Sequence, residues 1–159
     1  MLLLNEGASP NTCPKGGTAL TCAVDIAHSE IVFALLKAGA DAKRSFGKDV
    51  GSMELIHEEN SSGSYYIDVS FENGGLGFSG QDFGSSVGDS WGSDEYEYWY
   101  RFDRSQADAL WSLLGCAGAS QAEKLAVLKA RVHDLHSFIE LRELCDKNGI
   151  NYGFFSYCH

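Results

Sequence analysis

The sequence predicts an α+β protein in which partial helical repeats are followed by a mainly antiparallel sheet with packed helices. Three observations lead to this prediction. A helical pattern recurs within residues 1–43, several short strand-like segments follow it, and capped helical segments come after most of the strands. Strands grouped before helices, rather than alternating with them, are typical of α+β architecture. We therefore expect a repeat segment over residues 1–43 and an α+β domain over residues 44–159.

The first part contains a repeated motif. LLNEGASPN (residues 3–11) matches LLKAGADAK (residues 35–43), and GTALTCA (17–23) and HSEIV (28–32) lie between them. The offset of about 32 residues is close to the ankyrin period. These segments resemble an ankyrin repeat, although Ala19 replaces the usual proline and Thr21 the usual histidine. The resemblance implies a pair of helices and a protein-binding role.

The chemistry of this segment agrees with paired helices. Thr18 is placed to cap the first helix, and Gly39 lies where the second must end in a left-handed residue. Apolar residues are spaced along one face of each helix, namely Leu20, Ala23, Val24, Ile31, Val32, Leu35 and Leu36. About one and a half repeats cannot bury these faces alone. Residues 1–43 must therefore continue an array or pack on the rest of the chain.

Strand signals begin after the repeat segment. Residues 65–71 alternate with a period of two, and the Asn73-Gly74-Gly75 run is a strong hairpin-turn signal. A long Gly-, Ser- and Asp-rich stretch over residues 80–92 predicts a loop. The other expected strands cover residues 53–57, 76–79, 96–102 and 150–157.

Three helices are predicted between the last two strands. Ser105 begins a capping-box-like sequence, and that helix runs to Leu114 before Gly115. Ser120 with Glu123 forms a cleaner capping box for a helix through residue 132. A third helix covers about residues 136–147 and ends at Asn148-Gly149.

The composition limits the classes of function. The 159 residues are 44% hydrophobic, which suffices for a core, and the formal net charge of −10 disfavours nucleic acid and anionic membranes as partners. A basic protein is the expected partner. Five irregularly spaced cysteines predict reduced thiols, and the sequence shows no signal peptide and no apolar run long enough to cross a bilayer. We expect a cytoplasmic protein.

The sequence lacks a recognisable catalytic constellation. The glycines of residues 74–80 have the wrong spacing for a phosphate-binding loop, and no Lys-Ser/Thr pair follows them. His133 and His136, with Cys145 further along, are too few for a zinc site. We therefore expect no enzyme activity, no metal and no cofactor. A hydrolase that uses a cysteine or histidine is kept as a remote alternative.

Acidic and aromatic residues are mixed throughout residues 80–100. Tyrosine and tryptophan are common interface anchors, and carboxylates between them attract a basic partner. In a strand over residues 96–102, alternate aromatic residues would face the core while Glu95 and Glu97 face water. The preceding loop is the stronger binding candidate. The candidate partner-binding residues are Asp82, Phe83, Asp89, Trp91, Asp94, Glu95 and Glu97.

Residues 49–157 resemble small bacterial domains found among toxin immunity proteins. The resemblance rests first on GQDFG (residues 80–84), YEY (96–98) and LLG (113–115). Three shorter motifs near the end of the chain agree with it, namely FI (138–139), CD (145–146) and NGI (148–150). It implies tight binding that neutralises a cognate toxin, and many such toxins are basic nucleases. An ankyrin-type adaptor or scaffold protein is the main alternative function.

Overall fold

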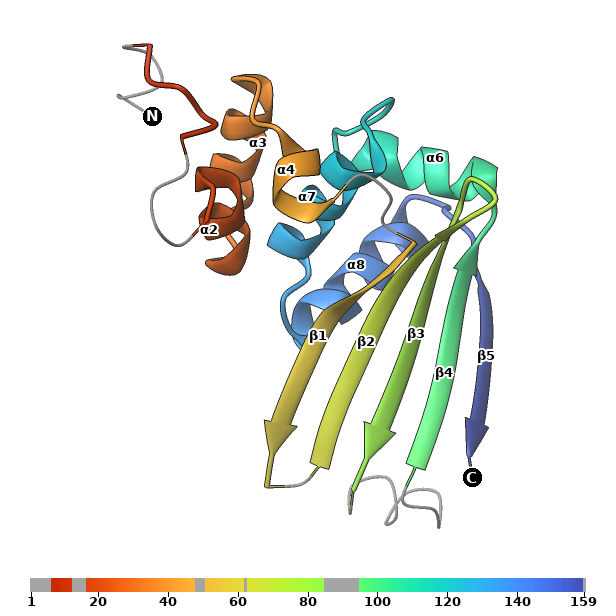
Figure 1. The fold of residues 1–159 in the computed structure, drawn as a ribbon. Coiled ribbons are helices and arrows are strands. Elements are labelled where there is room, and N and C mark those ends of the chain that lie inside the picture. Colours follow the sequence, from red (N-terminus) through yellow and green to blue (C-terminus); the bar gives the residue numbers. More distant parts are fainter. Residues whose placement is uncertain (1–6, 13–16, 48–50, 62, 85–94, 159) are drawn as a thin grey trace.

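The sheet has five strands in the order β1-β2-β3-β4-β5, and every neighbouring pair is antiparallel. The computed structural model describes residues 7–12, 17–47, 51–61, 63–84 and 95–158. Helices and strands are combined in this part of the chain, and the sheet is open (Figure 1). The predicted α+β class with a mainly antiparallel sheet is confirmed.

The strands follow the chain as a meander. They are β1 (Ser52–Asn60), β2 (Gly63–Glu72), β3 (Gly75–Phe83), β4 (Glu95–Phe102) and β5 (Gly153–Cys158). Asn73 and Gly74 form the predicted two-residue turn, and both have positive φ angles, of 52° and 79°. Such angles match the twist of the flanking strands, which is why Asn-Gly is favoured there.

The predicted loop over residues 80–92 is wrong at its start, because β3 continues to Phe83. Gly80 is needed for this continuation, since the Tyr98 ring of β4 lies directly over it and a Cβ at residue 80 would overlap the ring. Cross-strand pairing with β4 thus overrides the turn preference of the glycine. Residues 85–94 lie outside the described part of the chain.

Three short helices precede the sheet in the described part of the chain. They are α2 (Ala19–Asp25), α3 (Ser29–Lys37) and α4 (Ala42–Phe46). As predicted, the Thr18 hydroxyl accepts a hydrogen bond from the Thr21 backbone N–H, and Gly39 is left-handed with φ of 86°. Helix α4 is not foreseen by the sequence pattern. The Asp41 carboxylate caps it, so the expected boundary after residue 43 falls inside a helix.

The three later helices are α6 (Arg104–Leu113), α7 (Gln121–Arg131) and α8 (Leu135–Lys147). The Ser120–Glu123 capping box predicted for α7 is present. The predicted start of α6 is slightly late, because Asp103 and not Ser105 is its N-cap; the Asp103 carboxylate accepts bonds from the Gln106 N–H and the Ser105 hydroxyl.

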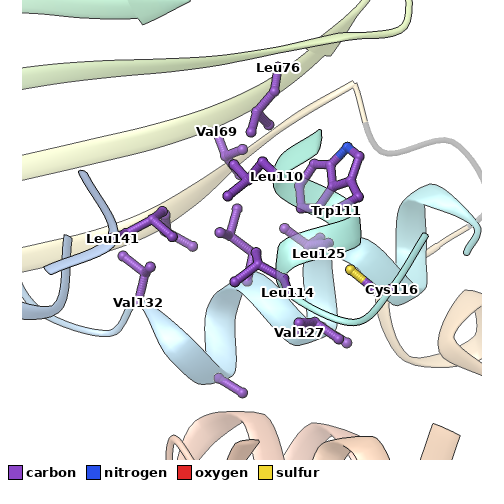
Figure 2. Close-up of a cluster of buried hydrophobic side chains, with 14 of the residues drawn as sticks. Val69, Leu76, Leu110, Trp111, Leu114, Cys116, Leu125, Val127, Val132 and Leu141 are labelled. Carbon is purple, nitrogen blue, oxygen red and sulfur yellow. The ribbon is translucent and has the colours of Figure 1, made fainter. Parts of the chain in front are cut away.

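The core lies between the sheet and these helices, and it extends through α7 to the N-terminal helices (Figures 1 and 2). Helix α7 is buried on several sides, and α2, α3 and α4 all contact it. Residues 17–46 therefore pack on the rest of the chain, which is one of the two expected ways to bury their apolar faces. The buried α7 residues are Ala122, Leu125, Ala126, Val127, Leu128 and Ala130.

Candidate functional site

The two faces of the sheet have different environments. Alternate residues such as Val69, Phe78 and Tyr100 are buried on the helix side, where Phe138 of α8 contacts Phe78 and Tyr100. All helices of the described residues gather on one side and towards one end of the strands (Figure 1). We call the other side, which no described helix covers, the open face.

Aromatic residues extend across the open face. In one cross-strand row, His57 of β1 stacks on Tyr66 of β2 with ring centroids 4.3 Å apart, and Tyr157 of β5 ends the same row. In the next row, Trp99 of β4 lies opposite Phe155 of β5. Phe155 and Tyr157 are 60% and 58% exposed. Exposed aromatic side chains of this kind are available as anchors for a partner.

The charge of the open face is strongly negative. Glu54 and Asp68 lie directly opposite each other on β1 and β2, an arrangement of like charges that destabilises a sheet. Arg101 is the one cationic side chain of lysine or arginine type that the described strands place on this face. The carboxylates that share it, by strand alternation, are Glu54, Glu59, Asp68, Glu72, Glu95 and Glu97.

Two neighbouring hollows follow β3 along the open face. Small residues of β3, Gly77 and Ser79, leave space between the larger side chains of β2 and β4. The larger hollow, of about 410 Å³, includes Arg101 and Glu72, whereas the smaller one, of about 220 Å³, includes Asp68 and Glu97. Ser79 and Trp99 line both. The two hollows therefore adjoin each other along β3.

The predicted site residues separate into three groups. Phe83, Glu95 and Glu97 lie on the open face, at the ends of β3 and β4. Asp82 precedes Phe83 in β3, and successive residues of a strand point to opposite faces. Asp82 therefore points to the helix side of the sheet, as Tyr98 does. The remaining predicted residues, Asp89, Trp91 and Asp94, are outside the described residues.

Tyr66, Asp68 and Trp99 are not among the residues predicted from the sequence. All three line the smaller hollow of the open face. The period-two alternation places Tyr66 with Asp68 in one strand and Trp99 with Glu97 in another, but it does not show that the two sets share a face. Both faces carry aromatic residues, so the alternation alone does not tell which face the helices cover.

Asp82 is partly buried beside Tyr98. The Tyr98 hydroxyl donates a hydrogen bond to Asp82 Oδ1 at 3.3 Å, and Tyr98 is buried against Gly80. Burial raises the Asp82 pKa to about 6, and the Tyr98 hydrogen bond opposes that shift. Burial also raises the Tyr98 pKa. Asp82 is thus less suited than the open-face carboxylates to attract a partner.

This environment predicts a pH effect on stability. The raised pKa means that the folded state binds the Asp82 proton more tightly than the unfolded chain does. The resulting stabilisation is present at pH 4 and is lost as the pH rises through about 6. We expect urea unfolding from pH 4.5 to 7 to show a smaller fall in stability for Asp82→Asn than for the wild type. The control Asp108→Asn removes an exposed charge on α6, and equal pH profiles for the wild type and Asp82→Asn would contradict this assignment.

Two cysteines of the described residues, Cys116 and Cys145, are buried. Burial raises the pKa of both the Cys116 and Cys145 thiols to about 11, so they are protonated at neutral pH. His133 and His136 are exposed, next to Asp134 and Glu140 respectively. No three His, Cys, Asp or Glu side chains of the described part are grouped as a metal site requires, and no helix there has the length and apolarity to cross a membrane.

Comparison of the chain with protein-family models, with curated proteins and with solved structures finds no match. The ankyrin and immunity resemblances therefore rest on the sequence motifs alone.

Proposed function

We propose that this protein is a protein-binding module whose open face holds a basic partner, and that it acts as an immunity protein against a cognate bacterial toxin. The observation that carries the proposal is the composition of the open face: six carboxylates and one arginine are combined with accessible aromatic side chains. Carboxylates speed the capture of a basic protein, and aromatic anchors hold it.

The aromatic side chains of the open face are spread widely enough for one partner to contact several of them. A standard interface buries about 800 Å² on each partner. Phe155 and Tyr157 are 60% and 58% exposed and can contribute to such an interface, whereas Tyr66 and Trp99 are already partly buried. Tyr66, Trp99, Phe155 and Tyr157 are distributed over three of the five strands, so one partner surface can reach all four. Because β5 is at the sheet edge, Phe155 and Tyr157 form the rim of this surface.

The immunity role adds a specific partner to this binding surface. It is motivated by the motif resemblance of residues 80–84 and 96–98, which includes the ends of β3 and β4. We expect the product of the adjacent gene to be a basic toxin that co-purifies with this protein at low salt, and we expect co-expression to protect cells. Association should weaken as salt rises, since exposed charges are screened. Failure to bind or to protect would contradict the immunity role.

An adaptor function has one observation in its favour. Helices α2 and α3 leave Ile26, Ile31 and Phe33 at least 37% exposed, and a partner that recognised the ankyrin-like segment would cover them. In the same co-purification, the Ile26→Asp/Ile31→Asp variant tests this surface. Loss of the partner from this variant alone would favour the adaptor, whereas unchanged binding would favour the open face.

A further inference from the structure

We propose that the smaller hollow of the open face binds the guanidinium group of an arginine side chain presented by the partner protein. This inference deepens the proposed function, on which it rests, by assigning the chemical group that the site recognises. Six side chains line the hollow together with the backbone of Gly80: Tyr66, Asp68, Ser79, Gln81, Glu97 and Trp99.

The register of three strands builds the hollow. Ser79 lies between Asp68 of β2 and Trp99 of β4, and Gln81 lies between Tyr66 and Glu97. The short Ser79 side chain lies at the bottom of the hollow, and longer side chains surround it on both sides. The hollow has a volume of about 220 Å³. The hollow therefore has room for the end of a long side chain that lies on the face of the sheet.

The charges of the hollow favour a cation. Asp68 and Glu97 approach from opposite sides, and none of the lining side chains is basic. The exposed Asp68 carboxylate makes no hydrogen bond or ion pair within the described residues, and it lies opposite Glu54 on β1. The Gln81 side chain donates a hydrogen bond of 2.8 Å to Glu97 Oε1, which fixes that carboxylate at the hollow. A bound cation would relieve the repulsion between Asp68 and Glu54.

The aromatic walls favour arginine over lysine. Trp99 and Tyr66 offer flat rings, and Tyr66 is itself held by stacking on His57. A guanidinium is planar, so it stacks on such rings while its N–H groups reach carboxylates on two sides. The ammonium of lysine is a compact, strongly hydrated charge that gains less from a ring face.

The charge of the adjoining hollow indicates which end of β3 would bind the cation. Arg101 contributes a positive charge to that larger hollow, whereas the smaller one has two carboxylates and no cation. Because both hollows share Ser79 and Trp99, a partner segment that lies along β3 would place its arginine at the Asp68 end.

The test uses the full chain and an acetylated, amidated tri-arginine peptide as the probe. Indole N–H resonances are followed by NMR during titration, and the Trp99 resonance is assigned with Trp99→Phe. We expect a saturable shift of the Trp99 indole, with at least tenfold weaker binding of the neutral tri-citrulline peptide and weaker binding of tri-lysine. Asp68→Asn should weaken tri-arginine binding about tenfold, as expected for loss of a charge-assisted contact. Asp108→Asn, an exposed change on α6, should have no such effect.

Several results would overturn the assignment: no Trp99 shift, equal affinity for citrulline or lysine, or equal effects of Asp68→Asn and Asp108→Asn. The outcome is distinguishable from that of the proposed function. If the toxin binds and protection occurs but the hollow ignores arginine, only this inference is wrong. If arginine binds in the hollow but no toxin binds, the immunity role is wrong while the site remains.

Discussion

Leu125→Ala is expected to lower the free energy of unfolding by about 2–5 kcal/mol, because it leaves a cavity in the core. Leu125 is fully buried in α7 and belongs to the cluster between the helices and the sheet (Figure 2). Helix α7 also carries the contacts of α2, α3 and α4. The variant should therefore destabilise the N-terminal helices and the sheet together.

Urea unfolding followed by circular dichroism measures the loss, and amide hydrogen exchange compares α3 with β2. We expect the slowest amides of both elements to lose similar protection. Leu113→Ala, a change at a leucine that is 38% exposed on α6, is the matched control and should cost less than about 1 kcal/mol. A loss confined to the sheet, or two separate unfolding transitions, would show that residues 17–46 are energetically independent.

Glu95→Lys/Glu97→Lys is expected to slow association with the proposed basic partner by about 10- to 1,000-fold at low salt, because it reverses two charges on the open face. Both residues lie on β4 and face away from the helices. The change should also make the association rate less sensitive to salt, since fewer attractive charges remain to be screened.

The control for this variant is Asp108→Lys/Glu143→Lys, which changes the net charge equally at exposed positions of α6 and α8. Stopped-flow association rates at two salt concentrations compare the two proteins. If both variants slow association to the same extent, net charge and not the open face controls capture. Unfolding measurements on each variant confirm that the fold is retained before the rates are compared.

Local chemistry made several elements predictable from the sequence. The Ser120–Glu123 capping box and the Asn73-Gly74 turn each satisfy their backbone requirements within a few residues, so their signals do not depend on the rest of the fold. Burial of Leu20, Ala23 and Val24 followed from helical spacing in the same way. By contrast, the extension of β3 to Phe83 depends on pairing with β4, which is distant in sequence.

The site was predictable only in part, for a related reason. Alternation places Glu95 and Glu97 on one face, as the structure confirms, but it does not reveal that Asp82 belongs to the other face or that β2 contributes Asp68. The hollow between Asp68 and Trp99 arises from the register of three strands. No single segment contains that information.

The most direct test of the central claim is the response of the tryptophan indole resonances when the proposed basic partner is added. Trp99 lies on the open face, and Trp111 is 2% exposed in the core. We predict a large change for the Trp99 indole and little change for that of Trp111. Binding that leaves the Trp99 resonance unchanged would contradict the assignment of the open face as the interface.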